Sequence, residues 1–233
     1  MKELKQPLAA KYHNYFSDAI PVGCATPKSY LFDADLYGYI DEPSQFSNII
    51  SVLNMMEEGD TFTLNLQSGG GSLDATDALI HAMRKTKGDI HIVATGNCSS
   101  AATLILLEAH SFELSDGFNA LLHCGSLGTI GNLSEYKQQT AFYGKFMENT
   151  LRNAYCGFLS EKEIADMLDG KDIWVNAEEW TDRHEQRNEF FHKEVEKLAN
   201  AYQTLETQTE ETNKEVSVKP VVKTKKKPVA KAV

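Results

Sequence analysis

Apolar positions follow two periods that alternate along most of the chain. Segments in which apolar and polar residues partly alternate, or apolar residues run together, predict strands at 30–39, 61–67, 89–96, 112–116, 119–123 and 172–175. Between them, apolar residues three or four positions apart predict helices at 46–56, 73–83, 99–109 and 133–156, with another beginning at Ser160. Strands alternating with helices at this spacing predict an α/β domain with parallel pairing.

The two ends depart from this pattern. Residues 1–28 contain three prolines without clear periodicity, so we expect an N-terminal arm, followed by the main domain at 29–180. An amphipathic C-terminal helix is expected at 181–206, with a seam at heptad spacing formed by Phe191, Val195, Leu198, Tyr202 and Leu205. This seam either packs against the chain's own body or contacts another subunit. The sequence then turns polar and lysine-rich, which predicts a disordered tail at 207–233.

Composition narrows the class of protein. Hydrophobic residues make up 42% of the 233 positions, enough for a sizeable core. The net charge is −10, but residues 216–233 hold six lysines and no acid, so the remainder carries 17 basic and 33 acidic side chains, a net of −16. Such an acidic body is a poor nucleic-acid binder. No apolar run has the length of a signal peptide or membrane span, and the four cysteines are scattered, which favours a reducing, cytoplasmic location without membrane contact.

Two glycine- and serine-rich turns each follow a predicted strand and open a helix. Residues 68–72, SGGGS, permit positive φ and leave free N–H donors, but they lack the lysine of a phosphate-binding loop, which disfavours a nucleotide. Residues 96–102, GNCSSAA, can present a serine hydroxyl to a cleft, with the next N–H available to an oxyanion. The alternative is that Ser99 or Ser100 only caps the helix.

A serine nucleophile needs a base and an acid that orients the base. Of seven histidines, His123 alone ends a predicted strand and runs into a glycine-rich loop, and Asp172 begins another strand. No HExxH motif is present, and Cys124 has no partners at metal-ligand spacing, so we expect no metal and no cofactor.

The segments QSGGGS, GNCSSAA, ALLH and KDIWVNAEEW, in this order, resemble the ClpP family of serine peptidases, the proteolytic subunits of Clp proteases. The resemblance runs from about Tyr30 to Trp180. It implies an α/β fold of the ClpP/crotonase type with repeated ββα units and a long handle helix at 133–156, to which this chain adds an extra C-terminal helix.

By position, the resemblance implies that Ser100 is the nucleophile, with Ser99 as the second candidate. It likewise implies that His123 is the general base and Asp172 the acid that orients it. The N–H groups of Gly71 and Ala101 match the oxyanion hole. The chain departs from the family pattern in Ala101-Ala102, where the family often has Met-Gly, in Cys124-Gly125, where it has Gln-Pro, and in everything after Trp180. The family's N-terminal axial segment is not recognisable in residues 1–28.

The implied function is a serine endopeptidase acting on polypeptides in a homo-oligomer, with heptameric rings stacked in pairs. Two versions stay open: a subunit fed by an AAA+ unfoldase, and a stand-alone maturation peptidase of the kind bacteriophages use on capsid precursors. Two alternatives also remain, a non-catalytic ClpP-like scaffold or regulatory subunit, and an acyl-CoA enzyme of the crotonase fold. The last needs a catalytic glutamate near the second turn, where only Glu108 is available, well into the helix.

Overall fold

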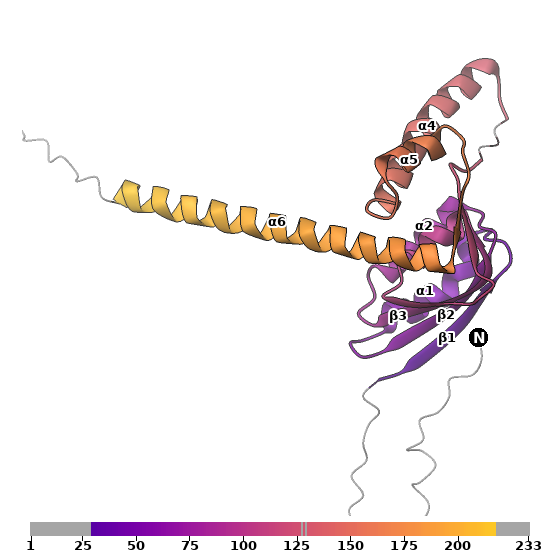
Figure 1. Ribbon diagram of the computed structural model, residues 1–233, viewed down its shortest axis with the longest axis horizontal. Coiled ribbons are helices and arrows are strands. Elements are labelled where there is room, and N and C mark those ends of the chain that lie inside the picture. The colour runs from indigo at the N-terminus through magenta and orange to yellow at the C-terminus, as the bar shows by residue number, and fades with distance from the viewer. Residues whose placement is uncertain (1–28, 127, 129, 218–233) are drawn as a thin grey trace, which may run out of the picture. The chain divides into compact units, whose positions relative to one another are not determined.

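The computed structural model describes residues 29–126, 128 and 130–217, with side chains through residue 203. The expected arm at 1–28 and the end of the tail at 218–233 lie outside the described residues. The chain divides into two compact units, residues 1–187 and residues 188–233. The first holds the sheet and its covering helices (Figure 1).

The first unit is built on a six-stranded sheet in the order β1-β2-β3-β5-β6, with β4 pairing β3 beside β5. Its strands are β1 (Leu31–Tyr37), β2 (Thr61–Ser68), β3 (Asp89–Ser99), β4 (Ser111–Leu114), β5 (Asn119–Leu122) and β6 (Ile173–Asn176). Pairing is parallel as predicted, except that β5 and β6 run antiparallel. β3 is longer than expected, because residues 97–99 continue the ladder with β5 after the pairing with β4 ends.

The helices also fall where the periodicity placed them. They are the 3-10 turn η2 (Pro43–Phe46), α1 (Ser47–Met55), α2 (Leu73–Met83), α3 (Ala101–Leu106), α4 (Leu133–Ala154) and α5 (Glu161–Leu168). All six residues of α3 are buried, and this helix contacts α2, β2, β3 and β5 at the centre of the core. The α/β fold is therefore confirmed, and its most buried helix is the one that follows the GNCSSAA turn.

Two helices begin with reciprocal caps that the sequence encodes. The Asn132 side chain accepts from the Glu135 N–H while the Glu135 carboxylate accepts from the Asn132 N–H, and Ser160 and Glu163 repeat this arrangement at the start of α5. Each capping box satisfies N–H groups that have no partner within the helix. The start of the long helix α4 is thereby fixed at Leu133, close to the predicted position.

The last helix corrects one boundary. α6 spans Ala177–Ser217, so it begins before the expected residue 181, and residues 207–217, which we expected to be disordered, are helical. Polar composition misled the prediction, since the segment lacks Gly and Pro and contains three glutamates, which favour a helix. Its first turns are anchored by Trp180, which is fully buried with its ring 4.7 Å from that of Phe158. The other divisions of the chain stay a prediction.

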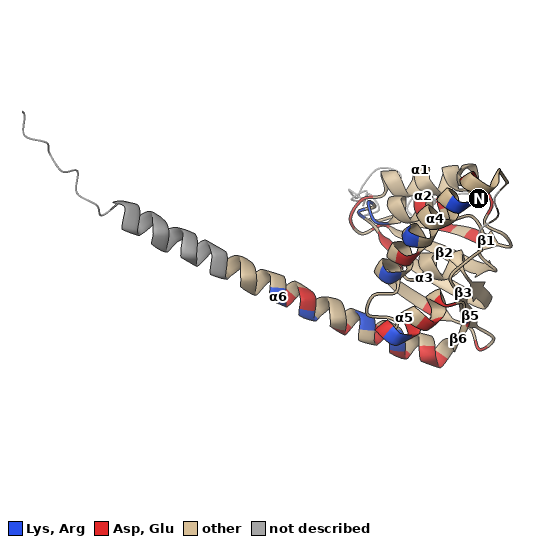
Figure 2. Cartoon of the chain, turned by 90° about the horizontal axis from the view of Figure 1, so that it is seen from above, with Lys and Arg blue, Asp and Glu red and all other residues tan. Residues whose placement is uncertain are grey.

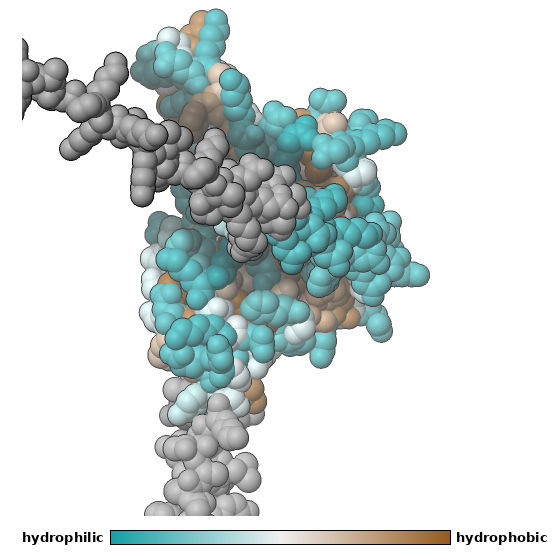
Figure 3. Space-filling model, turned by 90° about the vertical axis from the view of Figure 1, so that its left-hand side faces the viewer, coloured by the Kyte–Doolittle hydropathy of each residue, from teal (hydrophilic) through white to brown (hydrophobic). Residues whose placement is uncertain are grey.

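The surface visible in Figure 3 is mostly hydrophilic, with smaller hydrophobic patches between. Among the described residues, no helix combines the length and apolarity needed to cross a membrane.

The three cysteines in this part of the chain, Cys98, Cys124 and Cys156, are free thiols.

Candidate functional site

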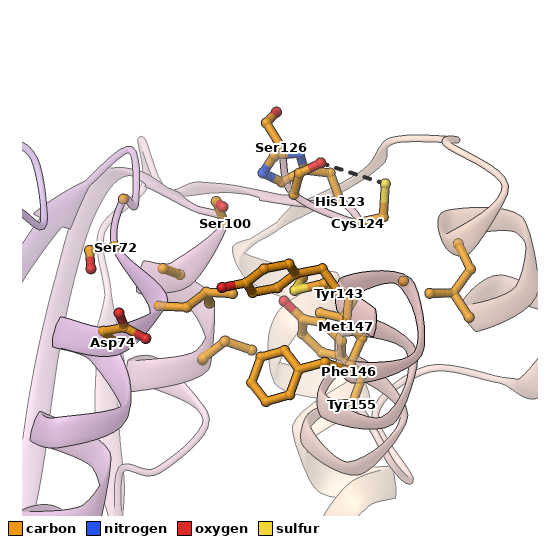
Figure 4. Close-up of a pocket in the computed structure, with 18 of the residues that line it drawn as sticks. Ser72, Asp74, Ser100, His123, Cys124, Ser126, Tyr143, Phe146, Met147 and Tyr155 are labelled. Carbon is orange, nitrogen blue, oxygen red and sulfur yellow. Dashed lines mark hydrogen bonds between the residues drawn. The ribbon is translucent and has the colours of Figure 1, made fainter. Parts of the chain in front are cut away.

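A cavity of about 590 Å³ lies where both glycine- and serine-rich turns meet the end of β5 and one face of α4. Figure 4 shows Ser100 and His123 at one rim, Ser72 and Asp74 on the α2 side, and the aromatic residues Tyr143 and Phe146 opposite. Of the residues that the sequence singled out, the cavity is lined by Gly71, Ser100, Ala101 and His123. Ser99 and Asp172 do not line it.

The first turn depends on two glycines. Gly70 has φ +91°, and a Cβ there would lie 2.6 Å from the Ser99 carbonyl oxygen and 2.7 Å from the Ser100 Cβ. Gly71 has φ +148°, and a Cβ there would overlap the carbonyl oxygen of Ile40. The sequence SGGGS therefore lets this turn press against the second turn on one side and against Ile40 on the other.

Ile40 fixes the direction of the Gly71 peptide. Its N–H donates to the Gly70 carbonyl at 3.0 Å, and its carbonyl accepts from the Ser72 N–H at 2.8 Å. In such a parallel bridge the N–H of the residue between these two points away from the bridging strand. Gly71 lines the cavity, and its N–H donates to no other described residue.

The second turn holds Ser100 in an unusual backbone conformation. Its φ of 56° and ψ of −127° make it the one non-glycine residue with positive φ in the described part of the chain. The conformation is held by three bonds: the Ser100 N–H donates to the Leu121 carbonyl at 2.7 Å, and the Ser100 carbonyl accepts from the Thr103 N–H at 2.9 Å and hydroxyl at 2.6 Å. A strained residue held this firmly is a common feature of functional sites.

The two serines of this turn differ in what their hydroxyls do. Ser99 is only 5% exposed, and its hydroxyl donates to the Asn97 amide oxygen at 2.5 Å. Ser100 occupies the N-cap position of α3 but makes no side-chain capping bond, and it lines the cavity. The capping interpretation is therefore wrong for Ser100, and it is the hydroxyl of Ser100 that is available to a bound molecule.

Ala101, the first residue of α3, supplies a second free backbone donor. The first N–H groups of a helix have no intrahelical acceptor, and the Ala101 N–H donates to no other described residue. Ala101 and Gly71 both line the cavity beside Ser100. Two such N–H groups can stabilise negative charge on an oxygen bound between them.

His123 follows the last residue of β5 and lines the cavity, half-buried. β5 is tied to the serine turn, because its Leu121 pairs with Ser99 and accepts from the Ser100 N–H. Within the described residues no hydrogen bond joins His123 to Ser100 or to Asp172. The structure thus brings the histidine to the serine's cavity without connecting the two.

Asp172 is exposed and precedes β6. The antiparallel register pairs Asn119 with Asn176 and, three steps on, Leu122 with Ile173. Continued by one residue, this register sets Asp172 opposite His123 at the end of the ladder. Residues directly opposite in an antiparallel pair project their side chains to the same face.

The wall opposite the serine is apolar and comes from α4, which the motifs did not indicate as part of a site. Tyr143, Phe146 and Met147 contribute to it, and Tyr155 also lines the cavity. The Tyr155 hydroxyl is 2.6 Å from that of Thr103, and burial raises the pKa of this phenol, which keeps it neutral. The aromatic residues at 142–146 were visible in the sequence, but only the fold shows which of them face the cavity.

Charge in the cavity is one-sided. Asp41 and Asp74 line it, no lysine or arginine does, and neither carboxylate forms an ion pair with another described residue. The described residues also contain no cluster of three or more His, Cys, Asp or Glu side chains that could hold a metal ion. The arrangement therefore offers a hydroxyl, an imidazole and two N–H donors beside an apolar wall.

Comparison with known proteins supports this architecture. The family model for Clp protease matches residues 36–183. Among solved structures, a single-residue mutant of ClpP1 from Listeria monocytogenes is similar to this chain. The match covers 65% of this chain and 86% of the ClpP1 chain, with 19% sequence identity and a TM-score of 0.51. No curated protein matches the chain. Residues 36–183 contain both turns, β5, α4 and Asp172, and over this span the chain belongs to the Clp protease family.

Proposed function

We propose that this protein is a serine endopeptidase in which Ser100 attacks the peptide carbonyl, His123 is the general base and Asp172 orients the histidine. The observation that carries the proposal is the conformation of Ser100, whose positive φ leaves its hydroxyl uncapped and in the cavity. The Clp protease family match supports this reaction class. Ser99, with its hydroxyl already bonded to Asn97, is the weaker candidate.

In the proposed mechanism the His123 imidazole takes the Ser100 proton as the hydroxyl oxygen bonds to the carbonyl carbon. The N–H groups of Gly71 and Ala101 stabilise the resulting oxyanion. The imidazolium then gives its proton to the departing amine, and a water molecule, activated by the same imidazole, hydrolyses the acyl-enzyme and restores Ser100. The apolar wall from α4 accommodates a substrate side chain.

The unbonded triad of this single chain calls for an ordering step. Catalytic hydrogen bonds are often long in the absence of substrate and tighten in the complex. Because Asp172 lies at the end of the β5–β6 ladder, extension of that ladder by one residue pair would bring its carboxylate toward His123. We propose that assembly or substrate binding supplies this step.

The active form is proposed to be a homo-oligomer, with heptameric rings stacked in pairs as in the family. α4 supports this, because its first half exposes the large apolar residues Leu133, Tyr136 and Phe142. Such a face is more readily explained by contact with another copy than by solvent. Hydrolysis measured with and without an AAA+ unfoldase distinguishes the two versions of the proposal. The free thiols of the described cysteines support a cytoplasmic location.

Hydrolysis of an unfolded fluorogenic polypeptide tests the proposal, with and without an unfoldase. Ser100→Ala should lower kcat by about 10⁴-fold or more, since removal of the nucleophile eliminates the covalent route. Ser99→Ala is the matched control and should retain most activity. Equal hydrolysis by the wild type and Ser100→Ala would overturn the assignment of Ser100, and no hydrolysis by either protein would overturn the proposal and favour a non-catalytic scaffold.

A further inference from the structure

The second unit presents a narrow apolar seam along α6. Val195, Leu198 and Tyr202 follow one another at intervals of three and four residues and are 64%, 68% and 69% exposed. Phe191 precedes them by four residues, and the sequence places Leu205 three residues after Tyr202. The helical backbone continues past this point to Ser217, so the whole series lies on one continuous helix.

The period of this series identifies the kind of contact it fits. Apolar residues at alternating steps of three and four repeat every 3.5 residues, which is the spacing of a coiled-coil seam. A helix that packs on a globular surface instead shows a wider stripe with a period of 3.6. The seam on α6 is therefore suited to another helix that runs alongside it.

The charged residues leave this seam free. Lys193 pairs with Glu189 at 3.4 Å and Lys197 with Glu194 at 2.6 Å, both within the helix. Figure 2 shows acidic and basic residues interspersed along the coloured part of α6. In a heptad labelled a to g, the seam residues occupy the inward positions a and d. Glu189, Lys193 and Lys197 occupy the outward positions b, f and c, and Glu194 occupies position g beside the seam. The helix balances its own charges there and needs no oppositely charged partner.

Residue types at the inward positions favour a second copy of the same helix. The central heptad of the seam, with Val195 at position a and Leu198 at position d, has the β-branched and leucine combination that favours a parallel pair of helices. Asn188 falls at position a as well, and a single asparagine there fixes register in parallel pairs. Identical helices in register place each inward residue against its own counterpart.

The flanking positions agree with self-pairing. In a parallel pair, Glu194 at position g faces the partner's Ala199 at position e, and Ala201 faces the partner's Glu206. No two like charges oppose each other across the seam between residues 194 and 206. This matters for a chain with a net charge of −10, because like-charge contacts would otherwise oppose self-association.

We propose that residues 188–208 of α6 form a parallel two-stranded coiled coil with the same segment of a second copy. Three heptads span about 30 Å and are marginal alone, but in the homo-oligomer proposed above, on which this step rests, the chains meet at high effective concentration. A parallel pair requires a two-fold axis along its length, and such axes relate rings stacked in pairs. The proposal concerns assembly through the second unit and does not depend on peptidase activity.

Disulfide cross-linking of the full-length protein under mild oxidation tests this proposal. Leu198→Cys and, in a separate variant, Phe191→Cys should each give a covalent dimer joined through the same position in both chains, mapped by peptide mass spectrometry. Only parallel in-register helices bring two positions a heptad apart each to its own counterpart, so a cross-link at one of the two alone would contradict parallel pairing. Glu196→Cys, on the outer face, should give only the background of the native cysteines. No dimer in Leu198→Cys, or equal dimer in Leu198→Cys and Glu196→Cys, would overturn the proposal.

Two lysine substitutions, one in the seam and one on the outer face, separate seam contact from general electrostatics. Adding Val195→Lys to Leu198→Cys should abolish the cross-link, since it places lysines against each other within the seam. Adding Glu196→Lys, which makes a larger charge change one residue away, should preserve the cross-link. Persistence of the cross-link with Val195→Lys, or its loss in both, would contradict the seam. Far-UV circular dichroism of each variant shows whether α6 remains helical.

Discussion

Leu122 and Ile173 form the last pair of the antiparallel β5–β6 ladder, so His123 and Asp172 are the next residue beyond that pair on each side. The two residues are 49 positions apart in the chain, and α4 and α5 lie between them. Antiparallel pairing of two short strands thus sets an acid and the proposed base at the same end of one ladder. This register is also what makes Asp172, rather than a neighbouring acid, the residue to test.

Asp172→Asn should lower kcat by about 10⁴-fold with little change in KM, because the imidazole would lose the carboxylate that sets its tautomer and stabilises its charged form. Asp169→Asn, at the exposed end of α5, is the matched control and should leave hydrolysis unchanged. Steady-state hydrolysis of a fluorogenic peptide measures both. Comparable rates for the two variants would remove Asp172 from the mechanism.

Gly70→Ala should disable the nucleophile turn without unfolding the domain. The new methyl group would lie 2.7 Å from the Ser100 Cβ and 2.9 Å from the Ala101 nitrogen, so the turn must move. We expect a fall in kcat of about 100-fold or more, the scale of losing one oxyanion donor. Strain of about 1–3 kcal/mol should also lower the melting temperature by several degrees.

The control for this variant is Gly117→Ala, where an added methyl group meets nothing within 4 Å. It should match the wild type in both hydrolysis and melting temperature. If Gly70→Ala retained full activity, the contact between the two turns would not position Ser100.

Alkylation of Cys124 should block the cavity. Cys124 lines the cavity beside His123 and is partly exposed. Cys98 is fully buried, and this burial raises the pKa of the Cys98 thiol and keeps the thiol unreactive. Iodoacetamide should therefore inhibit peptide hydrolysis by the wild type. Cys124→Ser should be active and resistant, and its inhibition by the reagent would place the effect at another cysteine.

The stability of the folded domain should fall at low pH as Glu163 becomes protonated. Its carboxylate accepts from Arg183 at 2.8 Å and from the Ser160 N–H and hydroxyl, and these bonds, that to Arg183 first, lower its pKa from 4.5 to about 2. A depressed folded-state pKa means that the added stability is fully present above pH 4.5 and is lost as the pH falls toward 2.

Glu163→Gln should accordingly lower the melting temperature at pH 7 by about 2–4 °C, for roughly 1 kcal/mol of capping and ion-pair stabilisation. The difference from the wild type should shrink as the pH approaches 2. Glu161→Gln, on the same helix, removes an exposed pair with Arg152 and should change little. A constant difference across the pH range would exclude titration of Glu163 as its cause.

The sequence predicted most elements of the fold, because the apolar periods at 61–67, 73–83 and 89–96 match buried faces that the structure also shows. It could not show the direction of β6, since periodicity is the same for either strand direction. Nor could the residues of the turn alone show which of Ser99 and Ser100 has its hydroxyl free in the cavity, because that depends on the backbone conformation. The cavity wall on α4 was likewise hidden, since helical spacing does not show which face meets the serine.

The length of α6 was missed for a different reason. Residues 207–217 have few apolar side chains, and composition of this kind is shared by solvated helices and disordered tails. Continuation from the helix anchored by Trp180 decides between them.

The most direct test of the account is labelling of the assembled protein with a fluorophosphonate, followed by mass spectrometry of the modified peptide. Only a serine with an adjacent base reacts readily with such a probe. We predict an adduct on Ser100 that is lost in Ser100→Ala, strongly reduced in His123→Ala and retained in Ser99→Ala. An adduct on Ser99, or no adduct on the assembled wild type, would contradict the assignment of Ser100 as the nucleophile.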